Sequence, residues 1–146
     1  MKVKDILKQK GPEVITIWED KSIISAVETM VQNKIGALLV MDEKGMITGI
    51  ISERDILRVI HFHLDKLREM KVREAMVKKV IIGDPGDTLE YIENIMTDNK
   101  IRHVPIILNE RLVGIISIGD IVKAVSKSIK TENRYLKDYI EGKYIA

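Results

Sequence analysis

One short string, Ser-x-x-Asp, occurs twice in the chain, as Ser52 to Asp55 and as Ser117 to Asp120. At the start of a helix, a serine and an acidic residue three positions later form a capping box, in which each side chain accepts a hydrogen bond from a backbone N–H. The same geometry suits a nucleotide. The free N–H groups and the positive end of the helix dipole favour phosphate, and the carboxylate can accept the hydroxyls of a ribose. The string alone leaves both interpretations open.

The string belongs to a longer internal repeat. Three segments of the first half correspond to three of the second: GIISERDI (49–56) to GIISIGDI (114–121), NKIGALLV (33–40) to NKIRHVPI (99–106), and KVKDIL (2–7) to KVREAM (71–76). In the first pair, six of eight positions are identical. This repetition favours a ligand site over a simple cap. The opening glycines, Gly49 and Gly114, either keep the strand clear for a ligand or are simply small strand residues.

Each repeat is predicted to fold in the order β-α-β-β-α, which makes the chain a mixed α/β protein. An extended segment comes first, at 14–17 and at 80–82. It precedes a helix with apolar residues at helical spacing, for which Ser22 and Thr88 are start signals. A hairpin follows, and the second helix opens at the serine of the repeated string. The hairpin strands are expected at 37–41 and 46–51, and at 104–108 and 112–116.

The repeat divides the sequence into three parts, predicted as repeat 1 at 1–66, repeat 2 at 67–126 and a C-terminal helical tail at 127–146. Each repeat has about 60 residues, which is small for an independent core. We therefore expect the two copies to pack together. The tail is polar, and its apolar residues have the spacing of an amphipathic helix. These residues are Tyr135, Leu136, Tyr139 and Ile140.

Composition excludes several classes of protein. The 146 residues include 24 basic and 22 acidic side chains, too balanced for a dedicated nucleic-acid binder. There is no cysteine, which excludes disulfides and zinc–thiolate sites and fits a reducing cytoplasm. The charged N-terminus is not a signal peptide, and no apolar run approaches the roughly 20 residues of a membrane span. We expect a cytoplasmic protein that does not engage a membrane.

Two copies of Gly-h-h-Ser-x-x-Asp, where h is apolar, each closing a β-α-β-β-α unit, resemble a pair of CBS (cystathionine-beta-synthase) domains over about residues 2–126. The resemblance is to the small stand-alone CBS-pair proteins. It implies two repeats packed by pseudo-twofold symmetry with two clefts, and a regulatory module that senses AMP, ADP or ATP. No cofactor is required in this interpretation. NAD or S-adenosylmethionine is an alternative ligand.

The resemblance also assigns residues to the clefts. It places the two aspartates of the string on ribose hydroxyls, its serines near phosphate, and a basic pair on the phosphates of the opposite cleft. Only the second repeat has that pair. One predicted cleft combines Ser52, Asp55, Arg102 and His103 with Val80 and Ile82 lining the base. The other combines Ser117 and Asp120 with Thr16, Gly36 and Ala37. We expect the first to be the stronger phosphate site, because a guanidinium binds phosphate bidentately, and the second to have little preference for phosphate.

Two other functions stay open, an enzyme and a structural dimerisation unit without a ligand. An enzyme is disfavoured because the repeated aspartates have matching contexts, whereas catalytic pairs need different environments. We therefore predict no catalytic residue. We predict no metal site either, because His61 and His63, two apart on a helix, face different sides. The expected partners are an adenosine nucleotide, an unidentified effector protein and a second copy of the chain. Candidate dimer residues, which could instead be interior, are Ile56, Val59, Ile60, Ile121, Ala124 and Val125.

Overall fold

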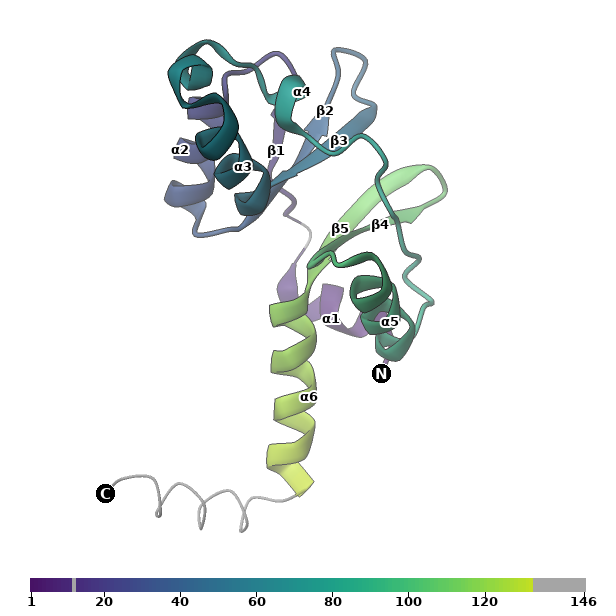
Figure 1. Cartoon of the computed structure of the whole chain (residues 1–146). Coiled ribbons are helices and arrows are strands. Elements are labelled where there is room, and N and C mark those ends of the chain that lie inside the picture. Colours follow the sequence, from purple (N-terminus) through teal and green to yellow (C-terminus); the bar gives the residue numbers. More distant parts are fainter. Residues whose placement is uncertain (12, 133–146) are drawn as a thin grey trace, which may run out of the picture. The chain divides into compact units, whose positions relative to one another are not determined.

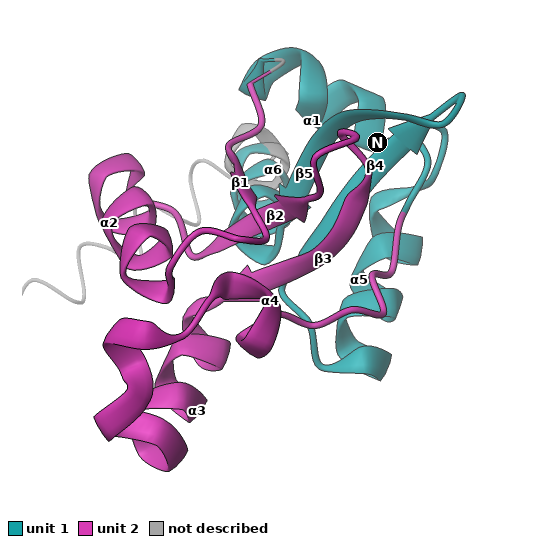
Figure 2. Ribbon diagram, turned by 90° about the horizontal axis from the view of Figure 1, so that it is seen from above, with its two compact units in different colours: residues 1–12, 83–146 teal, residues 13–82 magenta. Residues whose placement is uncertain are grey.

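The computed structural model describes residues 1–11 and 13–132, with side chains as far as Lys127 (Figure 1). The chain forms two compact units, which are described here one at a time (Figure 2). Unit 2 is Glu13–Ile82, and unit 1 joins Met1–Pro12 to Gly83–Ala146. The apolar residues predicted on the tail, 135–140, lie outside the described residues.

Unit 2 holds a three-stranded sheet in the order β1-β2-β3. Its elements are β1 (Thr16–Trp18), α2 (Ile23–Asn33), β2 (Ala37–Met41), β3 (Ile47–Ser52), α3 (Glu53–His63), the 3-10 helix η1 (Leu64–Glu69) and α4 (Val72–Ala75). β1 runs parallel to β2, and β2 antiparallel to β3. Figure 1 shows α2 and α3 on one side of this sheet. The main core cluster of unit 2, to which α4 contributes Val72, is aliphatic apart from one methionine: Ile17, Ala26, Met30, Leu38, Val40, Ile51 and Val72.

Unit 1 repeats this plan with a smaller sheet. Its elements are α1 (Val3–Lys10), α5 (Leu89–Asn99), β4 (His103–Leu108), β5 (Arg111–Ser117) and α6 (Ile118–Glu132). β4 and β5 are antiparallel. The segment predicted as extended at 80–82 forms no strand, and a single parallel bridge joins Gly83 to Ile106 instead. Pro85 follows two residues later and has no N–H to continue a ladder.

Corresponding sequences adopt corresponding local structures in the two units. The start of each hairpin pairs Ala37 with Ser52 and His103 with Ser117. Ser22 Oγ and Thr88 Oγ1 accept hydrogen bonds that cap α2 and α5, as predicted. The mixed α/β fold is therefore confirmed, and so is the predicted order β-α-β-β-α in repeat 1, whereas repeat 2 lacks the first strand of that order.

The leading helices of the two repeats are exchanged between the units. α1 precedes repeat 1 in sequence but belongs to unit 1, where the Val3 N–H donates to the Asp87 carbonyl at 3.0 Å. α4 belongs to unit 2, where the Val72 N–H donates to the Lys21 carbonyl at 2.8 Å. Val3 and Val72 are fully buried. The compact units therefore divide the chain after residues 12 and 82. The predicted boundaries at 66 and 126 describe the repeat in the sequence and do not coincide with the compact units.

Candidate functional site

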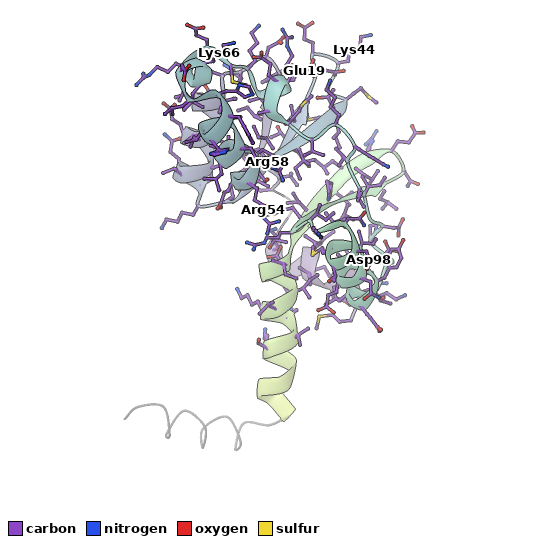
Figure 3. All side chains as sticks on the ribbon, in the orientation of Figure 1. Glu19, Lys44, Arg54, Arg58, Lys66 and Asp98 are labelled. Carbon is purple, nitrogen blue, oxygen red and sulfur yellow. The ribbon has the colours of Figure 1, made fainter. Side chains whose placement is uncertain are left out.

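In unit 2, the first copy of the string forms a closed hydrogen-bonded cap at the start of α3. The N–H and the hydroxyl of Ser52 donate to Asp55 Oδ2 at 2.8 and 3.0 Å. Asp55 Oδ1 accepts from Arg58 at 3.2 Å, and Arg58 is labelled in Figure 3. The Glu53 N–H donates to the Gly36 carbonyl at 3.0 Å. The Asp55 side chain is only 5% exposed, and both of its oxygens accept hydrogen bonds, Oδ2 from Ser52 and Oδ1 from Arg58.

In unit 1, the second copy forms the same cap at the start of α6. The Ser117 N–H donates to Asp120 Oδ2 at 2.9 Å, and the Asp120 N–H donates to Ser117 Oγ at 3.1 Å. The Ile118 N–H donates to the Arg102 carbonyl at 2.9 Å, as Glu53 does to Gly36 in unit 2. The capping box considered from the sequence is therefore present in both units.

The two caps differ in the cation that faces the carboxylate. Asp120 accepts a hydrogen bond from Lys10 Nζ at 2.9 Å, and the same ammonium donates to the Ile115 carbonyl at 2.8 Å. Burial raises the pKa of Asp120, but the hydrogen bonds from Lys10 and Ser117 outweigh burial and hold the pKa below its usual value. The Asp120 side chain is 23% exposed, which is more than that of Asp55. Asp120 is therefore a charged carboxylate that solvent can reach.

The structure groups the predicted site residues by unit. Unit 2 brings Ser52 and Asp55 beside Gly36 and Ala37. Unit 1 brings Ser117 and Asp120 beside Arg102 and His103. The remaining predicted residues all belong to unit 2: Thr16 is exposed on β1, Val80 is half-buried, and Ile82 is exposed. Each cleft predicted from the resemblance combines residues of both units, and those combinations stay a prediction.

The glycines of the repeated string are explained by packing within each unit. A Cβ on Gly49 would lie 2.7 Å from Met76 Sδ and 2.8 Å from the Val77 carbonyl oxygen. A Cβ on Gly114 would overlap Leu7 Cδ2. The absence of a side chain at Gly49 thus leaves room for the chain just after α4, and its absence at Gly114 leaves room for α1. Close approach within the protein accounts for them without a ligand.

Besides the contact of Arg58 with Asp55, two features of the site region were missed from the sequence. Lys10 was not assigned to Asp120, because 110 positions separate them and no local pattern connects them. A groove of about 380 Å³ in unit 2 was also missed. It is lined by Val27, Met30, Val31, Lys34, Ile35, Gly36, Glu53 and Ile56. Its only signal is that repeat 1 has apolar residues at positions 27 and 31 of α2, where repeat 2 has Glu93 and Thr97.

The candidate dimer residues separate into interior and exposed sets. Val59, Ile121 and Ala124 are buried, and the last two belong to the core of unit 1. Ile56 is half-buried and packs against the core of unit 2. Ile60 and Val125 are 41% and 42% exposed. Two further exposed residues occupy equivalent positions in the repeat, Leu57 on α3 and Val122 on α6. The exposed apolar residues of these helices thus include Leu57 and Val122, each one position after a residue that was predicted, Ile56 or Ile121.

The part of the chain that the structure describes was searched for clusters of metal-ligating side chains and for membrane-spanning helices. Within it, no three His, Asp or Glu residues gather closely enough to hold a metal ion. None of its helices combines the length and the apolarity that a membrane span requires.

The match to known proteins agrees with this geometry. The family model of the CBS domain matches residues 3–62 and 72–127. The chain belongs to the CBS domain family. CBS pairs are regulatory ligand-binding modules, and stand-alone CBS-domain proteins are generally regulatory rather than catalytic.

Individual CBS proteins resemble the chain over most of its length. The mitochondrial CBS domain-containing protein CBSX3 of Arabidopsis thaliana is 35% identical, over 97% of this chain and 73% of that protein. The crystal structure of ATU1752 from Agrobacterium tumefaciens is 41% identical with a TM-score of 0.82, over 84% of this chain and 92% of that one. The CBS pair of MJ0100, solved with methylthioadenosine and S-adenosyl-L-methionine, is 26% identical with a TM-score of 0.78, over 88% and 98% of the two chains.

Proposed function

We propose that this CBS pair senses adenosine nucleotides of the AMP, ADP and ATP class and catalyses no reaction. In this proposal Asp55 and Asp120 accept ribose hydroxyls, and Ser52 and Ser117 lie near phosphate. A relative, the CBS pair of MJ0100, was solved with two ligands that both contain adenosine. The proposal includes a cytoplasmic location, which rests on composition alone.

The observation that carries the proposal is the repeated aspartate at the third position of α3 and α6. In the same units, α2 and α5 are capped by Ser22 and Thr88 through a hydroxyl oxygen, without an acidic partner in a capping box. Capping in this fold therefore does not require a carboxylate. A buried polar group is costly unless it is hydrogen-bonded, and the buried carboxyl group of Asp55 needs contacts from both Ser52 and Arg58. A role in accepting ligand hydroxyls gives a reason for the carboxylate in both copies.

Calorimetric titration of the protein and of a double variant, Asp55→Asn with Asp120→Asn, tests the proposal. Asparagine keeps the shape and one acceptor oxygen, so folding measured by circular dichroism should persist while AMP, ADP and ATP binding is lost. Ser22→Ala is the matched control, because it removes a cap, worth about 1 kcal/mol, away from the proposed site. It should leave affinity unchanged.

Three results would contradict the proposal in different ways. Unchanged affinity in the double variant would reduce the repeated string to a helix cap. Tighter binding of NAD or S-adenosylmethionine than of any nucleotide would change the ligand. No binding of any of these ligands would favour a structural dimerisation module.

We also propose that the chain forms a homodimer through α3 and α6. The support is the exposed apolar residues at equivalent positions of the two helices, Leu57 with Val122 and Ile60 with Val125. Exposed apolar surface of this kind is commonly covered by a partner. A dimer is compatible with nucleotide sensing, because these residues lie outside the Ser-x-x-Asp strings.

A further inference from the structure

The carboxylate of Asp120 is held by a side chain from outside its own repeat. Lys10 is the last residue of α1, which ends where Gly11 takes a φ of 88°. Its ammonium contacts Asp120 Oδ2 at 2.9 Å and the Ile115 carbonyl at 2.8 Å. The Lys10 side chain is 33% exposed. Two acceptors therefore fix this ammonium at the site, while part of it stays open to solvent.

Asp55 has a different arrangement. In the sequence repeat, Lys79 occupies the position of Lys10. α4 ends at Ala75, however, and Val77 pairs with Ile50 through backbone hydrogen bonds of 2.9 and 3.0 Å. The cation at Asp55 is instead Arg58 of its own helix, whose side chain is 67% exposed. The Asp120 site therefore differs from the Asp55 site in having a lysine that comes from α1, outside its own repeat.

The position of Lys10 has a consequence for ligands. A carboxylate oxygen has two lone pairs, and Asp120 Oδ2 already accepts from Ser117 N–H and from Lys10. A ribose diol that uses both carboxylate oxygens must displace the ammonium. Neutral adenosine offers the displaced ammonium no anion, whereas a nucleotide offers its phosphate as a new charge-assisted partner.

We infer that Lys10 is a specificity-determining residue of the Asp120 site and makes it select anionic adenosine ligands over neutral adenosine. This inference rests on the proposed function. It replaces the expectation that this site has little preference for phosphate, which was based on Gly36 and Ala37 alone. A charge-assisted hydrogen bond changes affinity by roughly tenfold to a hundredfold. Partial exposure of Lys10 favours the lower end of that range.

The test isolates the Asp120 site in an Asp55→Asn parent and measures AMP and adenosine affinity by calorimetric titration. Adding Lys10→Met should weaken AMP binding, leave adenosine binding equal or tighter, and lower the ratio of the two affinities about tenfold. Lys10→Arg should keep the ratio of the parent, because it retains a cation. Lys8→Met, an exposed lysine of the same helix, is the matched control and should also keep it.

The outcomes separate the inference from the proposed function. A ratio within twofold of the parent in Lys10→Met, with AMP still bound, would overturn the role of Lys10 alone. A ratio that falls equally in Lys8→Met would also overturn it, because a general loss of positive charge would then explain the effect. If neither the unmodified protein nor any variant binds AMP or adenosine, the proposed function fails and the inference fails with it.

Discussion

Alanine substitution of the two glycines in the repeated string should have unequal effects on stability. At Gly49 the new methyl would meet Met76 Sδ at 2.7 Å and the Val77 carbonyl oxygen at 2.8 Å. That oxygen accepts the Ile50 N–H at 3.0 Å, so it is fixed by the backbone ladder. At Gly114 the methyl would meet only the side chain of Leu7, whose end can rotate away.

The magnitudes follow from two opposing contributions. Alanine in a strand is favoured over glycine by about 0.5–1 kcal/mol. Overpacking against groups that cannot move costs about 1–3 kcal/mol. We therefore expect Gly49→Ala to lower the free energy of unfolding by about 1–2 kcal/mol. Gly114→Ala should lower it by no more than about 1 kcal/mol, because Leu7 can relieve the overlap.

Guanidinium denaturation of each variant measures these differences through the midpoint at a constant m-value. A double-mutant cycle sharpens the comparison. Leu7→Ala should cost less in the Gly114→Ala background than in the unmodified protein, because the methyl fills part of the space. Met76→Ala should relieve Gly49→Ala only partly, because the Val77 carbonyl stays in place. If Gly114→Ala were as destabilising as Gly49→Ala, or if Gly49→Ala were stabilising, the Val77 carbonyl would not be the fixed obstacle at Gly49.

Three further predictions concern assembly, phosphate recognition and pH. Light scattering should give twice the 16.7 kDa chain mass, and Leu57→Glu with Val122→Glu should halve it; a monomeric unmodified protein would exclude the dimer. Arg102→Ala should weaken AMP binding roughly tenfold to a hundredfold and adenosine binding much less. An AMP affinity within twofold of that of the unmodified protein would show that Arg102 does not contact the ligand. Because the folded-state pKa of Asp120 lies below its usual 3.8, its pairing with Lys10 should stabilise the fold above about pH 4 and be lost as pH falls through the lowered pKa. Lys10→Met should flatten that acid-side loss in denaturation curves, and an unchanged slope would contradict the pairing.

Local structure was well determined by the sequence. The serines and threonine predicted to start helices are found at the helix starts, at positions 22, 52, 88 and 117. The hairpins follow their apolar runs, and the repeated strings adopt matching registers. Capping and strand alternation depend on neighbours within a few residues, which is why one sequence was sufficient. The capping box also followed from the string, but whether the string serves a ligand did not.

Contacts between residues far apart in the sequence became known only from the tertiary structure. Hydrophobic periodicity identifies the apolar face of a helix but not the unit that buries it, so the sequence could not reveal the exchange of α1 and α4. For the same reason, it could not show that Val59, Ile121 and Ala124 are interior while Leu57 and Val122 are exposed. The contact of Lys10 with Asp120 spans 110 positions. Equal strings form equal caps because capping is local, while the cation at each cap differs because α1 continues to Lys10 and α4 ends at Ala75.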